Sequence, residues 1–350
     1  MRRKRSPTSC RTPLTSDMLR PTRRTPRGPL LFPLYDTMRS NLRDSSAVPA
    51  LVPVSHESVA LPFKLLLPAF FSVAIVVVLP LLFSLYTSFT SYRLIEPETI
   101  WHFIGLRNYL RAFANEDFWA AFGRTVLFLT IALNLELVLG LGIALLLNEV
   151  TKGQRILRTI MMFPMMFSPV LVGFQFKFML NDSTGVINHL LQTLFGLQST
   201  IPFLVNANSA LASLIAAEVW NSTPVFAVIL LAGLMALPKD PIEASKVDGC
   251  TPLQTFRYVT LPYLMPFIYI AMTIRSLDVG RAYDIVRIMT NGGPGGRTEL
   301  LWTMVGRIAY DDSHMGYANA IGYVSVLVSV LFTLYFFRKL NAARKHMGPA

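Results

Sequence analysis

Charged and amide side chains interrupt several long apolar stretches of this sequence. A charge within a lipid bilayer costs a few kcal/mol even on the milder scales, so such side chains normally face protein or water and mark an ion pair or a polar path. Glu136 could line such a path or pair with Arg275, and Asp278 and Arg281 share a helical face and could pair. The polar positions of this kind are Asn134, Glu136, Glu218, Asn221, Arg275, Asp278 and Arg281.

Motifs for chemistry on a bound substrate are missing from the sequence. It contains no nucleotide-binding P-loop, no HExxH pair, no convincing nucleophile–base set and no metal-ligand spacing. We therefore expect no catalytic residues, no metal site and no ATP hydrolysis by this chain.

The composition is that of a membrane protein. Of the 350 residues 53% are hydrophobic and only 15% charged, whereas soluble domains average about 25% charged residues. A helix of about 20 residues crosses the hydrocarbon core, and nothing here alternates as a barrel strand does. The sequence therefore predicts an all-α integral membrane protein with six transmembrane helices, at residues 65–87, 125–147, 157–180, 209–237, 260–281 and 317–337.

Basic residues set the expected orientation. With the N-terminus inside, 22 of the 32 Lys and Arg residues fall on the cytoplasmic side. This distribution indicates membrane topology rather than a nucleic-acid-binding face. We expect a disordered cytoplasmic tail at 1–60, a six-helix transmembrane domain at 61–342 and a cytoplasmic C-terminal tail at 343–350, in a multi-pass membrane protein with both termini in the cytoplasm.

The polar loop at 238–260 shows a helix–glycine–helix pattern. Ile242–Val247 predicts a short helix that ends at Gly249, because glycine tolerates a positive φ. Thr251 can cap a second helix, with Pro252 at its first position and Gln254 completing a capping box. A bent element of this kind suits docking into a groove on another protein.

This loop resembles the EAA loop of binding-protein-dependent ABC importer permeases. The matching residues are Glu243, Ala244, Gly249, Leu261 and Pro262, while Ser245 and Val259 replace the usual alanine and isoleucine. In that family the loop sits in a cleft of the ATP-binding subunit. The resemblance implies that coupling to the ATP-binding subunit falls to Glu243, Ala244, Ser245, Asp248, Gly249, Phe256, Leu261 and Pro262.

Further segments resemble the sugar-type branch of that family, which includes maltose and glycerol phosphate permeases. They are FIGLRNYLRAF, GVINHLL, VWNSTPVFAVILLAGLMALP, TNGGPGGRTELL and GYANAIGY, between residues 103 and 337. In maltose-type members polar residues around the tryptophan of the third segment contact the sugar, which implies Glu218, Trp220, Asn221 and Ser222 here. A second family position falls on Val279 and Ala282, which are apolar, so we assign that work to Asp278 and Arg281.

The resemblance implies an importer of a sugar, oligosaccharide or polyol that works by alternating access. The expected partners are two ATP-binding subunits that hold ATP and Mg²⁺, a second homologous permease subunit, an extracytoplasmic solute-binding protein and membrane lipid. One alternative is an ion-coupled secondary transporter with Glu136 and Asp278 as proton sites, but it leaves the patterned loop unexplained.

Overall fold

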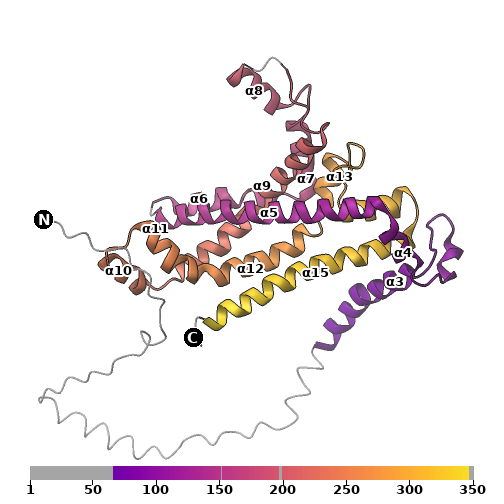
Figure 1. Ribbon diagram of the computed structural model, residues 1–350, viewed down its shortest axis with the longest axis horizontal. Helices are drawn as coiled ribbons and strands as arrows, with labels where there is room; N and C mark the ends of the chain where they lie inside the picture. The colour runs from indigo at the N-terminus through magenta and orange to yellow at the C-terminus, as the bar shows by residue number, and fades with distance from the viewer. Residues whose placement is uncertain (1–65, 151, 197–198, 347–350) are drawn as a thin grey trace, which may run out of the picture. The chain divides into compact units, whose positions relative to one another are not determined.

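The computed structural model describes residues 66–150, 152–196 and 199–346 (Figure 1). Within these ranges the chain is helical, with two isolated β-bridges and no β-strand. The all-α prediction is thus confirmed. The predicted tail at 1–60 lies outside the described residues, and the last helix continues to His346, into the segment predicted as a C-terminal tail.

The helices follow one another with short connections. After a helical stretch at 66–73, their bounds are η3 Ala74–Val78, α3 Leu79–Ser88, η4 Pro97–Trp101, α4 Arg107–Ala114, α5 Glu116–Glu149, α6 Gln154–Met162, η5 Pro164–Met166, α7 Pro169–Met179, α8 Val186–Phe195, α9 Ala207–Met235, α10 Lys239–Val247, α11 Pro252–Thr255, η6 Phe256–Thr260, α12 Leu261–Val279, α13 Asp284–Met289, α14 Leu301–Gly306, η7 Arg307–Asp311 and α15 Met315–His346.

Four of the described helices are long and apolar enough to cross a membrane. They are Leu66–Ser88, Glu116–Glu149, Ala207–Met235 and Met315–Ala343, with mean hydropathies of 2.7, 2.2, 1.7 and 2.1. The described residues fall into two separate compact units, which divide between Leu82 and Phe83. The described part of the first, 66–82, is a single helix whose side chains are nearly all exposed. The count of six spans stays a prediction.

The third predicted span, 157–180, is not one continuous helix. It is divided into α6, η5 and α7, with Phe167 extended between the last two (φ −80°, ψ 140°). Pro164 starts η5, and Pro169 follows Ser168, whose hydroxyl caps α7 by accepting from Leu171 N. A proline disfavours helical backbone at the residue before it, which explains why the helix breaks here.

The fifth predicted span corresponds to α12, a continuous 19-residue helix. Two charged residues, two tyrosines and two prolines make it less apolar than the four spans above. The chain enters it through α11 and the π-helical turn η6. The span is therefore shorter than predicted and unbroken, with its charges near the C-terminal end.

The bundle is built on two helix contacts. α5 packs along α9, and α12 packs on α15 and also touches α9 and α5 (Figure 1). A close approach of α5 and α9 occurs at Gly140, where an added Cβ would meet Phe226 Cβ at 2.5 Å. Small residues at such contacts allow membrane helices to approach closely. A second, smaller apolar cluster joins α4, the start of α5, α14, η7 and the start of α15.

The tight contact at Gly140 predicts different outcomes for two glycines on one helix. Gly142 lies two residues further along α5, and an added Cβ there would meet nothing within 4 Å. We expect Gly140→Ala to destabilise the protein by about 1–3 kcal/mol through overpacking, whereas Gly142→Ala is neutral or stabilising. Thermal unfolding in detergent measures the difference, and equal midpoints for the two variants would contradict the α5–α9 packing described here.

Candidate functional site

The loop between α9 and α12 has the predicted helix–glycine–helix form. α10 begins at Lys239, earlier than predicted, and its C-terminal turn leads to Gly249, which has φ +78°. The capping box is present: Thr251 N donates to Gln254 Oε1 at 2.8 Å, and Gln254 N to Thr251 Oγ1 at 3.4 Å. The predicted local structure is thus confirmed. In Figure 1 α10 and α11 lie at the end of the bundle opposite α4.

Ser245 ties the two arms of this loop together. Its hydroxyl donates to Ile242 O at 2.7 Å and lies 3.0 Å from Thr255 Oγ1, and the residue is only 6% exposed. The hydroxyl therefore has a partner in α11 that an alanine at this position would lack. We interpret the contact between Ser245 and Thr255 as one that holds α10 against α11.

Most of the predicted coupling residues are open to contact. Glu243, Ala244, Asp248, Gly249 and Pro262 are exposed, whereas Phe256 and Leu261 are half-buried. The apolar Val247 and Leu253 stand 87% and 74% exposed beside them. Exposed apolar side chains on a capped loop are features of a protein-binding surface.

One buried arginine contacts carboxylates that come from three helices. Arg275 of α12 donates from Nε to Glu136 Oε2 at 3.0 Å and from Nη2 to Glu136 Oε1 at 3.1 Å, so that it forms a two-point pair with α5. Nη2 also donates to Glu218 Oε1 of α9 at 2.7 Å. Nη1 donates to Asp278 Oδ2 at 3.3 Å. One guanidinium thus links three helices.

Because these charges are buried, the packing of α5, α9 and α12 depends on their pairing. Glu136 is fully buried, and Arg275 and Glu218 are 6% and 8% exposed. A buried charge left without its partner is strongly destabilising, even where the complete pair contributes little net stability. The predicted pairing of Glu136 with Arg275 is confirmed. Both oxygens of Glu136 accept from Arg275, which leaves this carboxylate tied down rather than open to a path.

The outer edge of the cluster is open. Asp278 and Arg281 have side chains 49% and 61% exposed, and Arg281 Nη2 lies 3.5 Å from Asp278 Oδ1. Their predicted pairing is confirmed. This edge therefore exposes a carboxylate and a guanidinium that are free to bond a polar partner or water.

The polar residues around Trp220 point in different directions. Ser222 Oγ donates to Glu218 Oε1 at 3.3 Å, within the charge cluster. Asn221 Nδ2 instead donates to Pro164 O at 2.8 Å and so binds a backbone carbonyl at the break between α6 and α7. Trp220 stacks on Phe167 at 6.3 Å between ring centroids. The structure thus does not assemble these four residues into one ring of sugar contacts.

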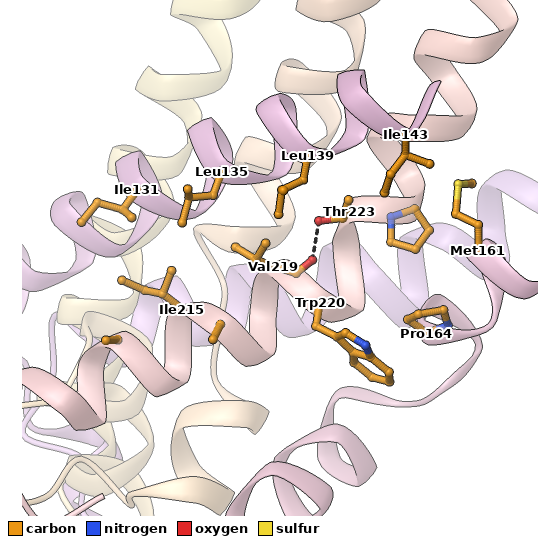
Figure 2. A pocket seen from close by; sticks show the side chains of 13 residues that line it. Ile131, Leu135, Leu139, Ile143, Met161, Pro164, Ile215, Val219, Trp220 and Thr223 are labelled. Carbon is orange, nitrogen blue, oxygen red and sulfur yellow. Dashed lines mark hydrogen bonds between the residues drawn. The ribbon is translucent and has the colours of Figure 1, made fainter. Parts of the chain in front are cut away.

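Trp220 borders an apolar groove of about 750 Å³ between α5 and α9 (Figure 2). The hydroxyl of Thr223 is already bonded to Val219 O at 2.6 Å. Such a groove offers a sugar almost no hydrogen bonds; it suits apolar side chains or lipid. Its lining is Ile131, Leu135, Leu139, Ile143, Met161, Pro164, Ala212, Ile215, Ala216, Val219, Trp220, Thr223 and Pro224.

Ion pairs also fix the segment between α12 and α15. Arg307 holds Glu299 at two points, 2.7 and 3.2 Å, and Arg287 holds Asp311 at 3.0 Å through both of its terminal nitrogens. The hydrogen bonds from Arg287 lower the pKa of Asp311 below its ordinary value. This exposed pair therefore stabilises the fold above the ordinary pKa of an aspartate, and the stabilisation is lost as the pH falls through the lowered value.

Sequence reasoning missed two features of the site. The sequence indicates Arg275 only as a possible partner of Glu136, whereas in the structure it is the centre of the cluster. The sequence also predicts one continuous span where the chain breaks at Pro164–Ser168, although two prolines five residues apart in an apolar stretch are a usable signal.

Membrane-length helices, buried paired charges and an exposed polar loop are together features of a membrane protein rather than of a soluble domain. Residues 136–346 match the family model described as binding-protein-dependent transport system inner membrane component. The chain belongs to this family.

Relatives and solved structures agree with that assignment. The chain is 38% identical to a probable ABC transporter permease protein of Sinorhizobium fredii, over 75% of its own length and 84% of the relative's. It is 33% identical to the trehalose/maltose transport system permease protein of Thermococcus litoralis, over 81% and 95%. A chain of a bacterial ABC transporter involved in alginate import has the same fold, with TM-score 0.70, 22% identity and coverage of 82% and 96%.

The arginine cluster predicts a stability pattern that a simple list of contacts would not. Arg275→Met should lower the free energy of unfolding by about 3–5 kcal/mol, because it leaves two buried carboxylates unpaired. Replacing Glu136 and Glu218 by Met in the same chain should recover most of that loss. Arg287→Met, which removes an exposed pair, should change little.

Thermal unfolding in detergent compares these variants. A triple variant no more stable than Arg275→Met would show that the three charges do not act as one cluster.

Proposed function

We propose that this chain is a transmembrane permease subunit of an ATP-driven importer, fed by a solute-binding protein, for a sugar, oligosaccharide or polyol. The observation that supports this most is the capped loop from Glu243 to Thr251, in which a positive-φ glycine joins two helices and leaves most of the family's coupling residues exposed.

The loop acts as the lever of the transport cycle. Two separate ATP-binding subunits, which hold ATP and Mg²⁺, grip it, and a second homologous permease subunit completes the pore. ATP binding favours one conformation because it makes different contacts with the loop in the two states. The bundle then opens alternately toward the binding protein and toward the cytoplasm. The chain itself supplies no hydrolytic site.

The solute class follows from the relatives. One is named for trehalose and maltose, another for sulfoquinovosyl glycerol, and a structure of the same fold belongs to an alginate importer. In this chain Asp278 and Arg281 supply polar groups to the path. The exposed carboxylate and guanidinium bond hydroxyl groups, which a sugar carries on every side.

The proposed setting is a bacterial inner membrane with both termini in the cytoplasm. The excess of Lys and Arg in the segments on that side supports this orientation. It places α10 and α11 next to the ATP-binding subunits and the α13–α14 region next to the binding protein.

Two glycines with nearly the same backbone conformation allow a direct test of whether the loop couples ATP hydrolysis to transport. Gly249 and Gly153 have φ values of +78° and +79°, and neither has an atom within 4 Å of an added Cβ. Backbone strain from a substitution is therefore similar at both. We expect Gly249→Trp to reduce solute-stimulated ATPase of the reconstituted complex at least tenfold, because the indole blocks the partner's cleft, whereas Gly153→Trp retains most of it.

ATPase assays with and without loaded binding protein, at matched amounts of assembled complex, separate these outcomes. Full stimulation in the Gly249→Trp complex would count heavily against the lever role.

A further inference from the structure

Asp278 occupies an unusual position in the charge cluster. Its side chain is half exposed, yet one oxygen accepts from Arg275, which is almost fully buried. The other two carboxylates on Arg275, Glu136 and Glu218, are buried and come from different helices. The cluster therefore has two inner members that hold the arginine and one outer member that the arginine holds.

We propose that Glu136 and Glu218 are positioning residues for Asp278. By fixing the guanidinium of Arg275 they aim the Asp278 carboxylate at the solute path, where it accepts hydrogen bonds from solute hydroxyls. This inference rests on the proposed function, since it names the residues that orient one solute contact of the same importer.

The hydrogen bonds show that Glu136 and Glu218 hold Arg275, and that Arg275 in turn holds Asp278. Glu136 bonds Nε and one terminal nitrogen of Arg275, which fixes the plane of the guanidinium against α5. Glu218 bonds the same terminal nitrogen and is itself held by Ser222. Only Nη1 then remains for Asp278. An arginine whose planar guanidinium is held at two points has little rotamer freedom. The position of its third partner, Asp278, is therefore well defined.

Asp278 depends on Arg275 for a fixed position, because its other contact is weak. Arg281 lies 3.5 Å from the other oxygen of Asp278 and is itself mostly exposed, so it holds the carboxylate weakly. Without Arg275 the carboxylate would turn about its own χ angles. A contact that is rigid before the solute arrives binds better, because no side-chain ordering is left to be done on binding.

The test compares two buried carboxylates, each held at two points by an arginine. Glu136→Gln keeps the size of the side chain but removes the charge that fixes Arg275. Glu299→Gln makes the same change in the Glu299–Arg307 pair, away from the cluster. Uptake of radiolabelled trehalose and maltose is measured in proteoliposomes that hold the whole complex, with loaded binding protein in the medium.

We expect Glu136→Gln to lower the amount of sugar transported per ATP hydrolysed about tenfold, because the permease binds the released sugar less well. The half-saturating concentration of sugar-loaded binding protein should change little. Glu299→Gln should leave the ratio of sugar to ATP unchanged. Glu136→Asp, which keeps the charge, should restore part of the ratio.

Other outcomes would overturn the inference. A merely structural role predicts that Glu136→Gln reduces the amount of assembled complex and lowers uptake and ATPase together, at an unchanged ratio. If Glu136→Gln does not assemble, Glu218→Gln is measured in its place, and an unchanged ratio there has the same meaning. Failure of the parent complex to carry these sugars, and any other sugar or polyol that its binding protein takes up, would count against the proposed solute class instead, so the two failures are distinguishable.

Discussion

Lipid cannot compensate a bare charge, and this constraint organises the bundle around Arg275. Its guanidinium contacts carboxylates from α5, α9 and its own helix α12. No two of these helices can separate in the bilayer without exposing a buried charge. The cluster therefore sets which helices stay together while the protein moves. It also places its only open carboxylate, Asp278, at the edge where polar groups are exposed.

The same constraint acts on the backbone. A break in a helix at membrane depth leaves amide groups that must find partners in protein or water. At the break between α6 and α7, Ser168 caps the second helix and Asn221 of α9 reaches the carbonyl of Pro164. The interruption is thus braced by the helix that also carries Glu218. The apolar groove beside it is lined by Trp220 and Pro164 (Figure 2). The side of α9 that faces this groove is therefore apolar, and Glu218 does not line it.

The predictable parts of this structure are the local ones. The capping box of Thr251 and Gln254, the turn at Gly249 and the Asp278–Arg281 pair each depend on residues within four positions of one another, so their spacing carries the information. The Arg275–Glu136 pair joins residues 139 positions apart, and spacing cannot rank it above other pairings of buried charges. The roles of Asn221 and Glu218 were predicted from a motif that places them side by side, whereas helix geometry sends them to different neighbours.

In the transport cycle that we propose, the arginine cluster holds Asp278 in water within the membrane, on the path of the solute. Labelling of an Asp278→Cys variant with a membrane-impermeant thiol reagent tests this role most directly, with the parent chain as background for Cys10 and Cys250. We predict that the new cysteine reacts in the assembled complex and that the transported sugar slows the reaction. A cysteine that stays unreactive in every state of the cycle, or that reacts equally with and without the sugar, would contradict it.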